Sequence, residues 1–326
     1  MATIFVTSLN LKRSSAACWI IKQNSMRKLI RKLLNTVGYD IVKVNVHSDK
    51  KASQVKKVKV GNYFVDMPGN NPQISNYKYE PQVNSQLGRL SACIAAKYPE
   101  LTVIDVGANV GDTIAVIKTA MDLPVIGIEG DDISYKFLER NTRQFSGVTI
   151  IKEFLGEKKQ TLKVELEKGG WNTTLVPSET TGKELTLRTL DEVLSASGLA
   201  DRSLKLLKVD CEGFDTIIIR GATSLLQQHR PVIYFEYNKS NMDAIKEDGF
   251  STLLSLEQYG YHSVILFDNK GRFLLNIDMA QRELLRQLHH YADENDSEIA
   301  YYDVCLFHDS DKDLEAGFLR GEAPYL

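Results

Sequence analysis

Apolar positions through the middle of the chain follow two patterns. Short runs that are apolar throughout predict strands buried on both faces of a sheet, at residues 102–106, 125–128, 148–151, 204–209 and 232–235. Longer stretches with apolar residues three and four positions apart predict helices, at residues 112–121, 133–145, 190–197 and 215–228. This alternation predicts a doubly wound α/β fold with a mostly parallel sheet.

The chain before this region predicts a basic amphipathic helix that ends at Gly38. Its apolar face carries Leu29, Ile30, Leu33, Leu34 and Val37, and its basic face carries Arg27, Lys28, Arg31 and Lys32. Packing of the apolar face on the main body is the favoured interpretation. Peripheral contact with anionic lipid is the alternative.

The pattern divides the chain into four segments. Residues 1–25 have no periodicity and predict a disordered extension, and residues 26–76 hold the basic helix and a connecting segment with a hairpin in "VKKVKVGNYFVDMPGNNP". The α/β domain is expected at 77–310, and a tail at 311–326. A helix is expected to end near Pro99.

Composition and charge restrict the function. The 326 residues are 43% hydrophobic, which suffices for a full core. Residues 1–60 hold 13 Lys and Arg but only Asp40 and Asp49, so the remainder has a net charge of -13. A nucleic-acid groove needs positive potential, so binding of nucleic acid through the basic N-terminus is disfavoured. The four cysteines form no CxxC pair and no apolar run spans a membrane, which favours a cytoplasmic protein.

The sequence "VIDVGANVGDT" at residues 103–113 places glycines where a strand gives way to a helix. Gly107 permits a tight turn, and Gly111 lets a ligand or the following helix approach the backbone. A dinucleotide fingerprint would need glycine at Asn109 and Asp112, and the ending of a phosphate-binding P-loop is absent. Asp105 and Asp112 would repel a pyrophosphate and attract a sulfonium or amino group. The loop therefore predicts a site for a cationic nucleoside.

Glu129 ends the second predicted strand. An acid at this position accepts hydrogen bonds from both ribose hydroxyls of a bound nucleoside. The alternative is that Glu129 caps the next helix, but Asp131 and Asp132 already serve that purpose.

The order and spacing of eight motifs resemble the FkbM family of S-adenosylmethionine-dependent methyltransferases. The motifs are "YEP" (79–81), "VIDVGANVGDT" (103–113), "GIEGD" (127–131), "LG" (155–156), "TLDEVL" (189–194), "LLKVDCEGFD" (206–215), "IRGA" (219–222) and "RPVIYFE" (230–236). The resemblance covers roughly residues 79–267.

The resemblance implies a seven-stranded, Rossmann-like sheet whose antiparallel last strand is "YYDVCLF", residues 301–307. It also implies S-adenosylmethionine as the cofactor. The implied cofactor-binding residues are Glu80, Asp105, Gly107, Ala108, Asn109, Gly111, Asp112, Glu129, Gly130, Phe154 and Leu155. The chain departs from the family at residues 152–154, which are bulkier and more charged than the small residues usual there, and this bears on the adenine contacts.

The "KVDCEG" stretch provides candidate catalytic residues. Lys208 and Asp210 project from the same face of a strand, Glu212 follows at the turn, and Glu236 ends the next strand at the same edge. We expect Asp210 to accept the proton of the methyl acceptor. Lys208 is expected to tune the basicity of Asp210, and Glu236 to lie beside it. One alternative is a structural ion pair of Lys208 with Asp210 or Glu236. Another is a divalent cation held by Asp210, Glu212 and Glu236.

The acceptor is predicted from the stretch between the third and fourth strands. Residues 159–190 alternate like a hairpin around Gly-Trp-Asn-Thr, which would bring Trp171 and Asn172 toward the active edge beside Glu212. Aromatic rings stack on sugar faces, so with the family resemblance this predicts O-methylation of a carbohydrate or glycoconjugate hydroxyl. The alternatives are O-methylation of a small secondary metabolite and a nucleoside-binding module without activity.

Overall fold

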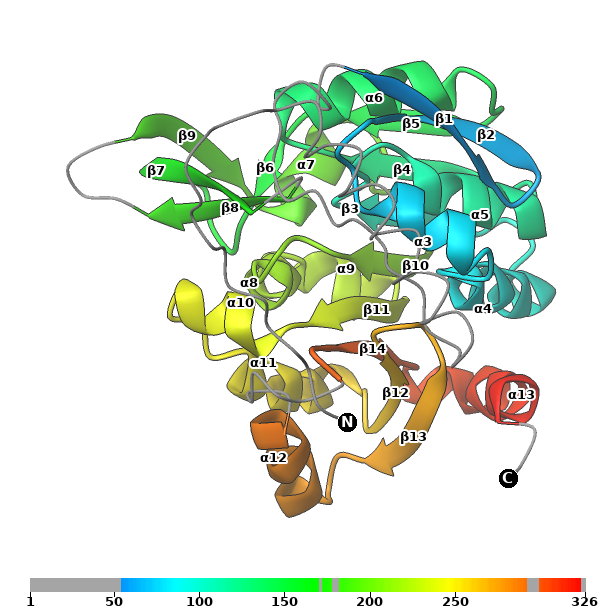
Figure 1. Ribbon diagram of the computed structural model, residues 1–326. Helices are drawn as coiled ribbons and strands as arrows, with labels where there is room; N and C mark the ends of the chain where they lie inside the picture. The colour runs from blue at the N-terminus through cyan, green and yellow to red at the C-terminus, as the bar shows by residue number, and fades with distance from the viewer. Residues whose placement is uncertain (1–53, 170–171, 178–181, 292–298, 324–326) are drawn as a thin grey trace, which may run out of the picture. The chain divides into compact units, whose positions relative to one another are not determined.

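One large sheet organises the described part of the chain (Figure 1). The computed structural model describes residues 54–323 apart from 170–171, 178–181 and 292–298, all within the unit of residues 48–326. The sheet has eight strands in the order β13-β12-β14-β11-β10-β3-β4-β5. They are β3 (Thr102–Val106), β4 (Val125–Ile128), β5 (Val148–Ile151), β10 (Leu204–Val209), β11 (Val232–Tyr237), β12 (Ser263–Asp268), β13 (Phe273–Asp278) and β14 (Tyr302–Leu306).

The five strands predicted from the apolar runs form the parallel half of this sheet, as expected. The chain passes outward from β3 through β4 to β5, and then returns to build β10 and β11 on the other side of β3. The strand order therefore reverses between β3 and β10. Ligands of open α/β sheets bind at the carboxyl ends of the strands at such a reversal.

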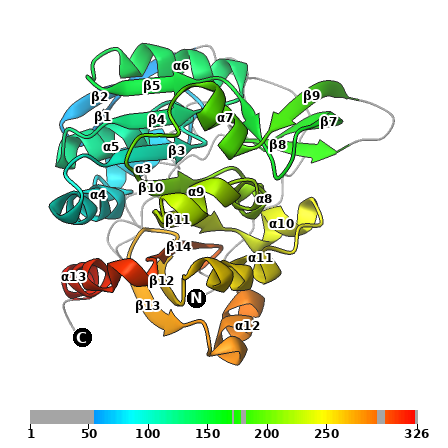
Figure 2. The ribbon, with the colours of Figure 1, turned by 180° about the vertical axis from the view of Figure 1, so that it is seen from behind.

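Alternate side chains of the buried strands point to opposite faces of the sheet, where they belong to two separate hydrophobic cores. In β3, Val103 belongs to one core and Ile104 to the other. The core around Val103 packs against α4 (Ser85–Lys97), α5 (Asp112–Ala120), α6 (Asp132–Thr142) and α13 (Lys312–Glu322). The core around Ile104 packs against α7 (Leu190–Ala196), α8 (Asp215–Arg220), α9 (Thr223–Gln228), α11 (Gly249–Ser255) and α12 (Arg282–Tyr291) (Figure 2). The doubly wound α/β fold is thus confirmed.

The antiparallel last strand is also confirmed, because β14 pairs antiparallel with both β11 and β12. The strand count differs from the expected seven. β13 pairs antiparallel with β12 and adds an eighth strand at the edge of the sheet. The helix predicted at 215–228 is two helices, since α8 ends at Arg220 with Gly221 as its C-cap and α9 begins after Ala222.

Smaller elements surround the sheet. The predicted hairpin is β1 (Val55–Val60) with β2 (Tyr63–Pro68), and α3 (Gln73–Tyr79) follows it, while α10 (Lys239–Ala244) follows β11. A four-stranded sheet stands apart from the large one and contains β6 (Phe154–Leu155), β7 (Gln160–Gly169), β8 (Asn172–Pro177) and β9 (Lys183–Arg188). The hairpin predicted in residues 159–190 corresponds to β7 and β8. The predictions for residues 1–53 and for Trp171 lie outside the described residues.

Candidate active site

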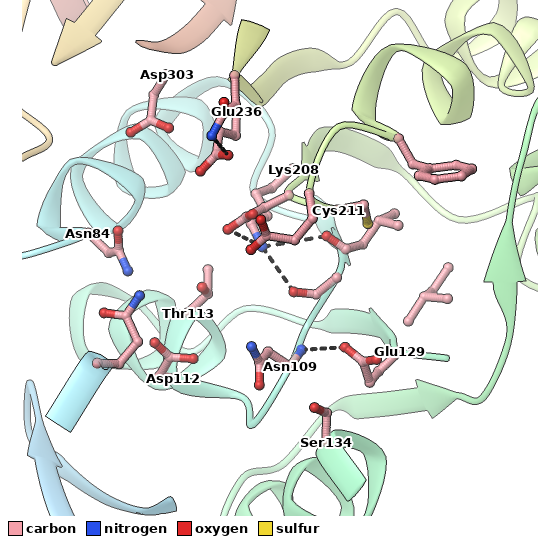
Figure 3. A pocket seen from close by; sticks show the side chains of 18 of the residues that line it. Asn84, Asn109, Asp112, Thr113, Glu129, Ser134, Lys208, Cys211, Glu236 and Asp303 are labelled. Carbon is pink, nitrogen blue, oxygen red and sulfur yellow. Dashed lines mark hydrogen bonds and ion pairs between the residues drawn. The ribbon is translucent and has the colours of Figure 1, made fainter. Parts of the chain in front are cut away.

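A cavity of about 400 Å³ lies at the carboxyl edge of the large sheet, where the strand order reverses (Figure 3). Its walls come from the loop after β3, the ends of β4, β10, β11 and β14, the β6 strand, and the segment from Pro72 to Asn84. The sequence-predicted residues that line it are Gly107, Asn109, Asp112, Glu129, Gly130, Phe154, Leu155, Lys208, Asp210, Glu212 and Glu236. The fold therefore brings most of the predicted site together.

Four predicted residues lie elsewhere. Glu80 is exposed and lines a separate groove beside α4 and the β12–β13 turn. Asp105 and Ala108 are buried beneath the loop. Gly111 precedes α5 with φ +85°, and a side chain there would meet Leu138 of α6 at 3.1 Å, so this glycine serves helix packing. Asn172 begins β8, and the position of its side chain lies outside what the structure describes.

Position 107 must be glycine because the backbone at the end of β10 lies so close to it. Its φ is +71°, and a Cβ atom there would lie 1.9 Å from the carbonyl oxygen of Asp210. Only glycine combines this conformation with so close a backbone contact. The glycine therefore brings the end of β10, with its acidic side chain, directly against the loop.

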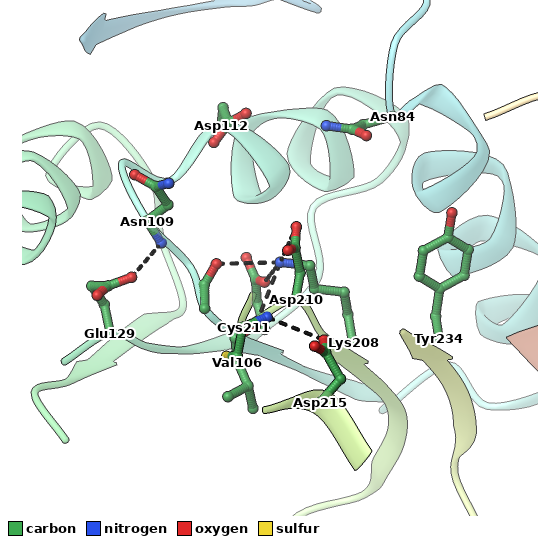
Figure 4. Close-up of polar contacts among 12 residues, drawn as sticks. Asn84, Val106, Asn109, Asp112, Glu129, Lys208, Asp210, Cys211, Asp215 and Tyr234 are labelled. Carbon is green, nitrogen blue, oxygen red and sulfur yellow. Dashed lines mark hydrogen bonds and ion pairs between the residues drawn. The ribbon is translucent and has the colours of Figure 1, made fainter. Parts of the chain in front are cut away.

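Glu129 is fixed by two backbone amides. The Asn109 N–H donates to Oε2 at 2.9 Å (Figure 4), and the Asp131 N–H donates to Oε1 at 2.7 Å. The helix cap is Asp131 instead, which accepts from the amides of Ile133 and Ser134. The capping alternative for Glu129 is thus wrong, and its carboxylate is held at the cavity wall.

Lys208 forms an ion pair with Asp210, as one alternative expected, but its closer partner is Asp105, which the sequence did not suggest. Lys208 and Asp105 are in register on neighbouring strands, and Nζ lies 2.9 Å from Asp105 Oδ1 but 3.7 Å from Asp210 Oδ2. The side chains of Lys208 and Asp105 are 4% and 0% exposed. Burial would lower the pKa of Lys208, but the carboxylates of Asp105 and Asp210 hold it above its ordinary value. Lys208 is therefore a fixed positive charge, and Asp105 is its support beneath the loop.

Asp210 lies beside the buried Lys208–Asp105 pair and lines the cavity, with a side chain that is 47% exposed. The turn after it is held by Asp215, whose carboxylate accepts from the amides of Cys211 and Gly213, each at 3.1 Å. Glu212 has φ +50° and accepts a hydrogen bond from Asn241 Nδ2 at 2.9 Å. Asp210 is thus the exposed carboxylate of a turn whose backbone is well fixed.

A scan against protein-family models identifies the family. The model described as the methyltransferase FkbM domain matches residues 75–263. The chain belongs to the FkbM methyltransferase family. The sequence resemblance is thereby confirmed, and with it membership of a family of S-adenosylmethionine-dependent methyltransferases.

Several solved structures that are similar to this FkbM chain are methyltransferases by name. A methyltransferase FkbM from Methylobacillus flagellatus KT is 19% identical over 54% of this chain and 43% of that chain, with a TM-score of 0.38. The chain thus spans less than half the length of that structure. Precorrin-6y C5,15-methyltransferase from Geobacter metallireducens GS-15 is 12% identical over 64% and 81% of the two chains, with a TM-score of 0.33.

The ribosomal protein L11 methylase from Lactobacillus delbrueckii subsp. bulgaricus is 12% identical over 69% of this chain and 78% of that chain, with a TM-score of 0.35. No curated protein sequence matches the chain significantly. In the described part of this FkbM protein, no helix combines the length and the apolar character needed to cross a membrane.

The FkbM site also contains residues that the sequence did not reveal. Tyr77 of α3 is buried, and its hydroxyl donates to Asp112 Oδ2 at 2.9 Å while accepting from Asn84 Nδ2 at 3.2 Å. This chain of hydrogen bonds ties the segment before α4 to the glycine loop. Asp303 of β14 also lines the cavity. Its position within the predicted antiparallel last strand, residues 301–307, was the only available signal.

The metal alternative lacks a preformed ligand set. Among the described residues, no group of three or more His, Cys, Asp and Glu side chains is arranged to hold a metal ion. Asp210, Glu212 and Glu236 all line the cavity but are not brought together in that way.

Three carboxyl groups, one of them fully buried, give the protein an expected pH dependence. Burial raises the pKa of Glu129, Asp215 and Asp303 to about 7 each. Between pH 5 and 7 these groups bind more protons in the folded state than in the unfolded state, so the free energy of unfolding falls as the pH rises through 7. Thermal unfolding from pH 5 to 8 should show this decline, with a shallower slope for Glu129→Gln. A melting temperature that rises steadily toward pH 8 would contradict it.

Proposed function

We propose that the protein is an S-adenosylmethionine-dependent O-methyltransferase whose acceptor is a carbohydrate or glycoconjugate hydroxyl. The observation that carries the proposal is the cavity itself. Glu129, fixed by two amides, lies on one wall, and the exposed carboxylate of Asp210 lies on another. The first suits the ribose of a nucleoside, and the second suits a reacting hydroxyl.

The residues around the cavity fit this cofactor. A volume of about 400 Å³ is within the range of small-molecule sites. Gly130 leaves space that the Phe154 ring fills, since a Cβ atom at Gly130 would lie 2.5 Å from that ring. Phe154, Leu155 and Ile128 together give an apolar wall for a base beside Glu129. When bound, the cofactor supplies an electrophilic methyl group on a sulfonium centre.

Asp210 is the group that takes the proton of the acceptor in this proposal. Its carboxylate is accessible from the cavity, and the buried Lys208 ammonium, held by Asp105, keeps a fixed charge beside it. Asp210 would take the proton that the acceptor oxygen loses, while the methyl group comes from the bound cofactor as its carbon–sulfur bond breaks and S-adenosylhomocysteine leaves. Tyr77 and Asn84 tie the segment before α4, which lines the same cavity, to Asp112 of the glycine loop.

Two results would distinguish this function from its alternatives. Mass spectrometry after incubation with candidate glycans and methyl-labelled cofactor should detect a glycan heavier by one methyl group. Methylation only of small aglycone alcohols would support the secondary-metabolite alternative. Cofactor binding without any transfer would support the nucleoside-binding module. Loss of activity with EDTA and recovery with magnesium would restore the metal alternative.

Cofactor recognition gives a direct prediction. S-Adenosylhomocysteine should bind and raise the melting temperature, whereas NAD should not, because carboxylates line the site where a pyrophosphate would lie. Isothermal titration calorimetry with both compounds checks this. Tighter binding of NAD would contradict the proposed cofactor.

Glu129→Ala should weaken S-adenosylhomocysteine binding by about 1 to 3 kcal/mol, the usual effect of losing hydrogen bonds to a charged group. The matched control is Glu100→Ala, an exposed acid at the opposite edge of the sheet, before β3. The control should bind with unchanged affinity. Equal affinities for both variants would remove Glu129 from the binding site.

A further inference from the structure

Two carboxylates face each other at one end of the cavity. Glu236 and Asp303 are directly paired in the antiparallel β11/β14 ladder, so their side chains project from the same face of the sheet with Cβ atoms about 5 Å apart. Both line the cavity. Figure 3 shows them together on the side away from Glu129. Directly opposed like charges repel each other, so this arrangement needs an explanation.

Neutral polar groups lie beside the two carboxylates. Asn238 Nδ2 donates to Glu236 Oε1 at 3.2 Å. On the Asp303 side, the buried Tyr234 hydroxyl accepts from the buried Gln86 amide at 2.9 Å. These groups are uncharged, so they do not neutralise the pair.

No Lys, Arg or His side chain of the described residues forms an ion pair with Glu236 or Asp303. Lys208, the buried lysine of this region, has its ammonium 2.9 Å from Asp105. Burial, followed by the charges of neighbouring carboxylates, raises the pKa of Glu236 well above its ordinary value. Two partly buried carboxylates this close are unfavourable as a pair of anions unless a proton or a cation neutralises them, and Lys208 forms its ion pairs with Asp105 and Asp210.

We propose that the acceptor carries a protonated amine beside the hydroxyl that is methylated, and that Glu236 and Asp303 together bind this ammonium group. The inference rests on the proposed methyl-transfer function and names the substrate class of the same site. An ammonium group has three N–H donors, enough to reach both carboxylates. Its charge relieves the repulsion between them. The acceptor class is therefore an amino sugar or another amino alcohol, with its hydroxyl toward Asp210.

The test uses two probes that share a backbone and differ in charge. Chitosan tetramer carries free amines, and its fully N-acetylated counterpart is neutral. Each is titrated by calorimetry into the full chain saturated with S-adenosylhomocysteine. The amine form should bind about 10-fold or more tightly, as expected for a charge-assisted contact. Glu236→Gln and Asp303→Asn should each remove most of this preference, while Glu100→Gln should retain it.

Several outcomes would overturn the inference. They are equal binding of the two probes, binding of neither, and a preference that survives in both variants. A loss of S-adenosylhomocysteine affinity in Glu236→Gln would assign the pair to the amino group of the cofactor instead. Tight binding of magnesium that Glu236→Gln abolishes would assign it to a metal. Failure of the proposed function is seen separately, as absence of S-adenosylhomocysteine binding by the unmodified protein.

Discussion

Asp210→Asn should lower methyl-transfer turnover by about 100-fold or more while leaving cofactor affinity nearly unchanged. Asparagine keeps the shape of the side chain but cannot accept the proton of the acceptor. Folding should also be preserved, because Lys208 keeps Asp105 at 2.9 Å when the more distant carboxylate at 3.7 Å loses its charge. Single-turnover kinetics, calorimetry with S-adenosylhomocysteine and the melting temperature measure the three quantities.

The matched control for this substitution is Glu212→Gln on the same turn. Glu212 also lines the cavity, but its carboxylate is bonded to Asn241. If Glu212 takes part in acceptor binding, Glu212→Gln should therefore raise KM more than it lowers kcat. Normal turnover of Asp210→Asn would remove Asp210 from the mechanism. A large fall in melting temperature would show that Lys208 depends on Asp210 more than the distances indicate.

The parallel half of the fold was predictable because a strand buried on both faces is apolar throughout. The runs before Gly107 and Glu129 have this character, so the strands and the residues at their ends could be located together. β13 was missed for the opposite reason. It is an edge strand whose residues are only partly buried, apart from Ile277, and its pattern is correspondingly mixed.

The chemistry at strand ends was less predictable, because a sequence shows neighbours along a strand but not across a sheet. Lys208 and Asp210 share a face of one strand, which suggested an ion pair between them. The closer partner is Asp105, which is in register on the adjacent strand β3. Asp303 and Tyr77 were missed for the same reason, since tertiary contacts bring them to the site from distant parts of the chain.

The assignment of Asp105 to the structural support of Lys208 makes a prediction for stability. Asp105→Asn should lower the free energy of unfolding by about 3 to 5 kcal/mol, because it leaves the buried Lys208 ammonium without its main partner. The Gly107 and Val106 carbonyls, at 3.3 and 3.5 Å, accept hydrogen bonds from the ammonium but carry no full charge. Denaturant unfolding of the cofactor-free protein, followed by circular dichroism, measures the change.

A double substitution separates the loss of the ion pair from other damage. Replacing both partners, as in Asp105→Leu with Lys208→Met, removes both buried charges at similar volume and should recover most of the lost stability, since apolar replacements of buried ion pairs are often neutral or stabilising. The same protein should lack activity, because the fixed charge beside Asp210 is gone. If Asp105→Asn unfolds with a free energy within about 1 kcal/mol of the unmodified protein, as surface substitutions do, Lys208 is supported by the loop carbonyls and Asp210, and Asp105 is free to serve the cofactor.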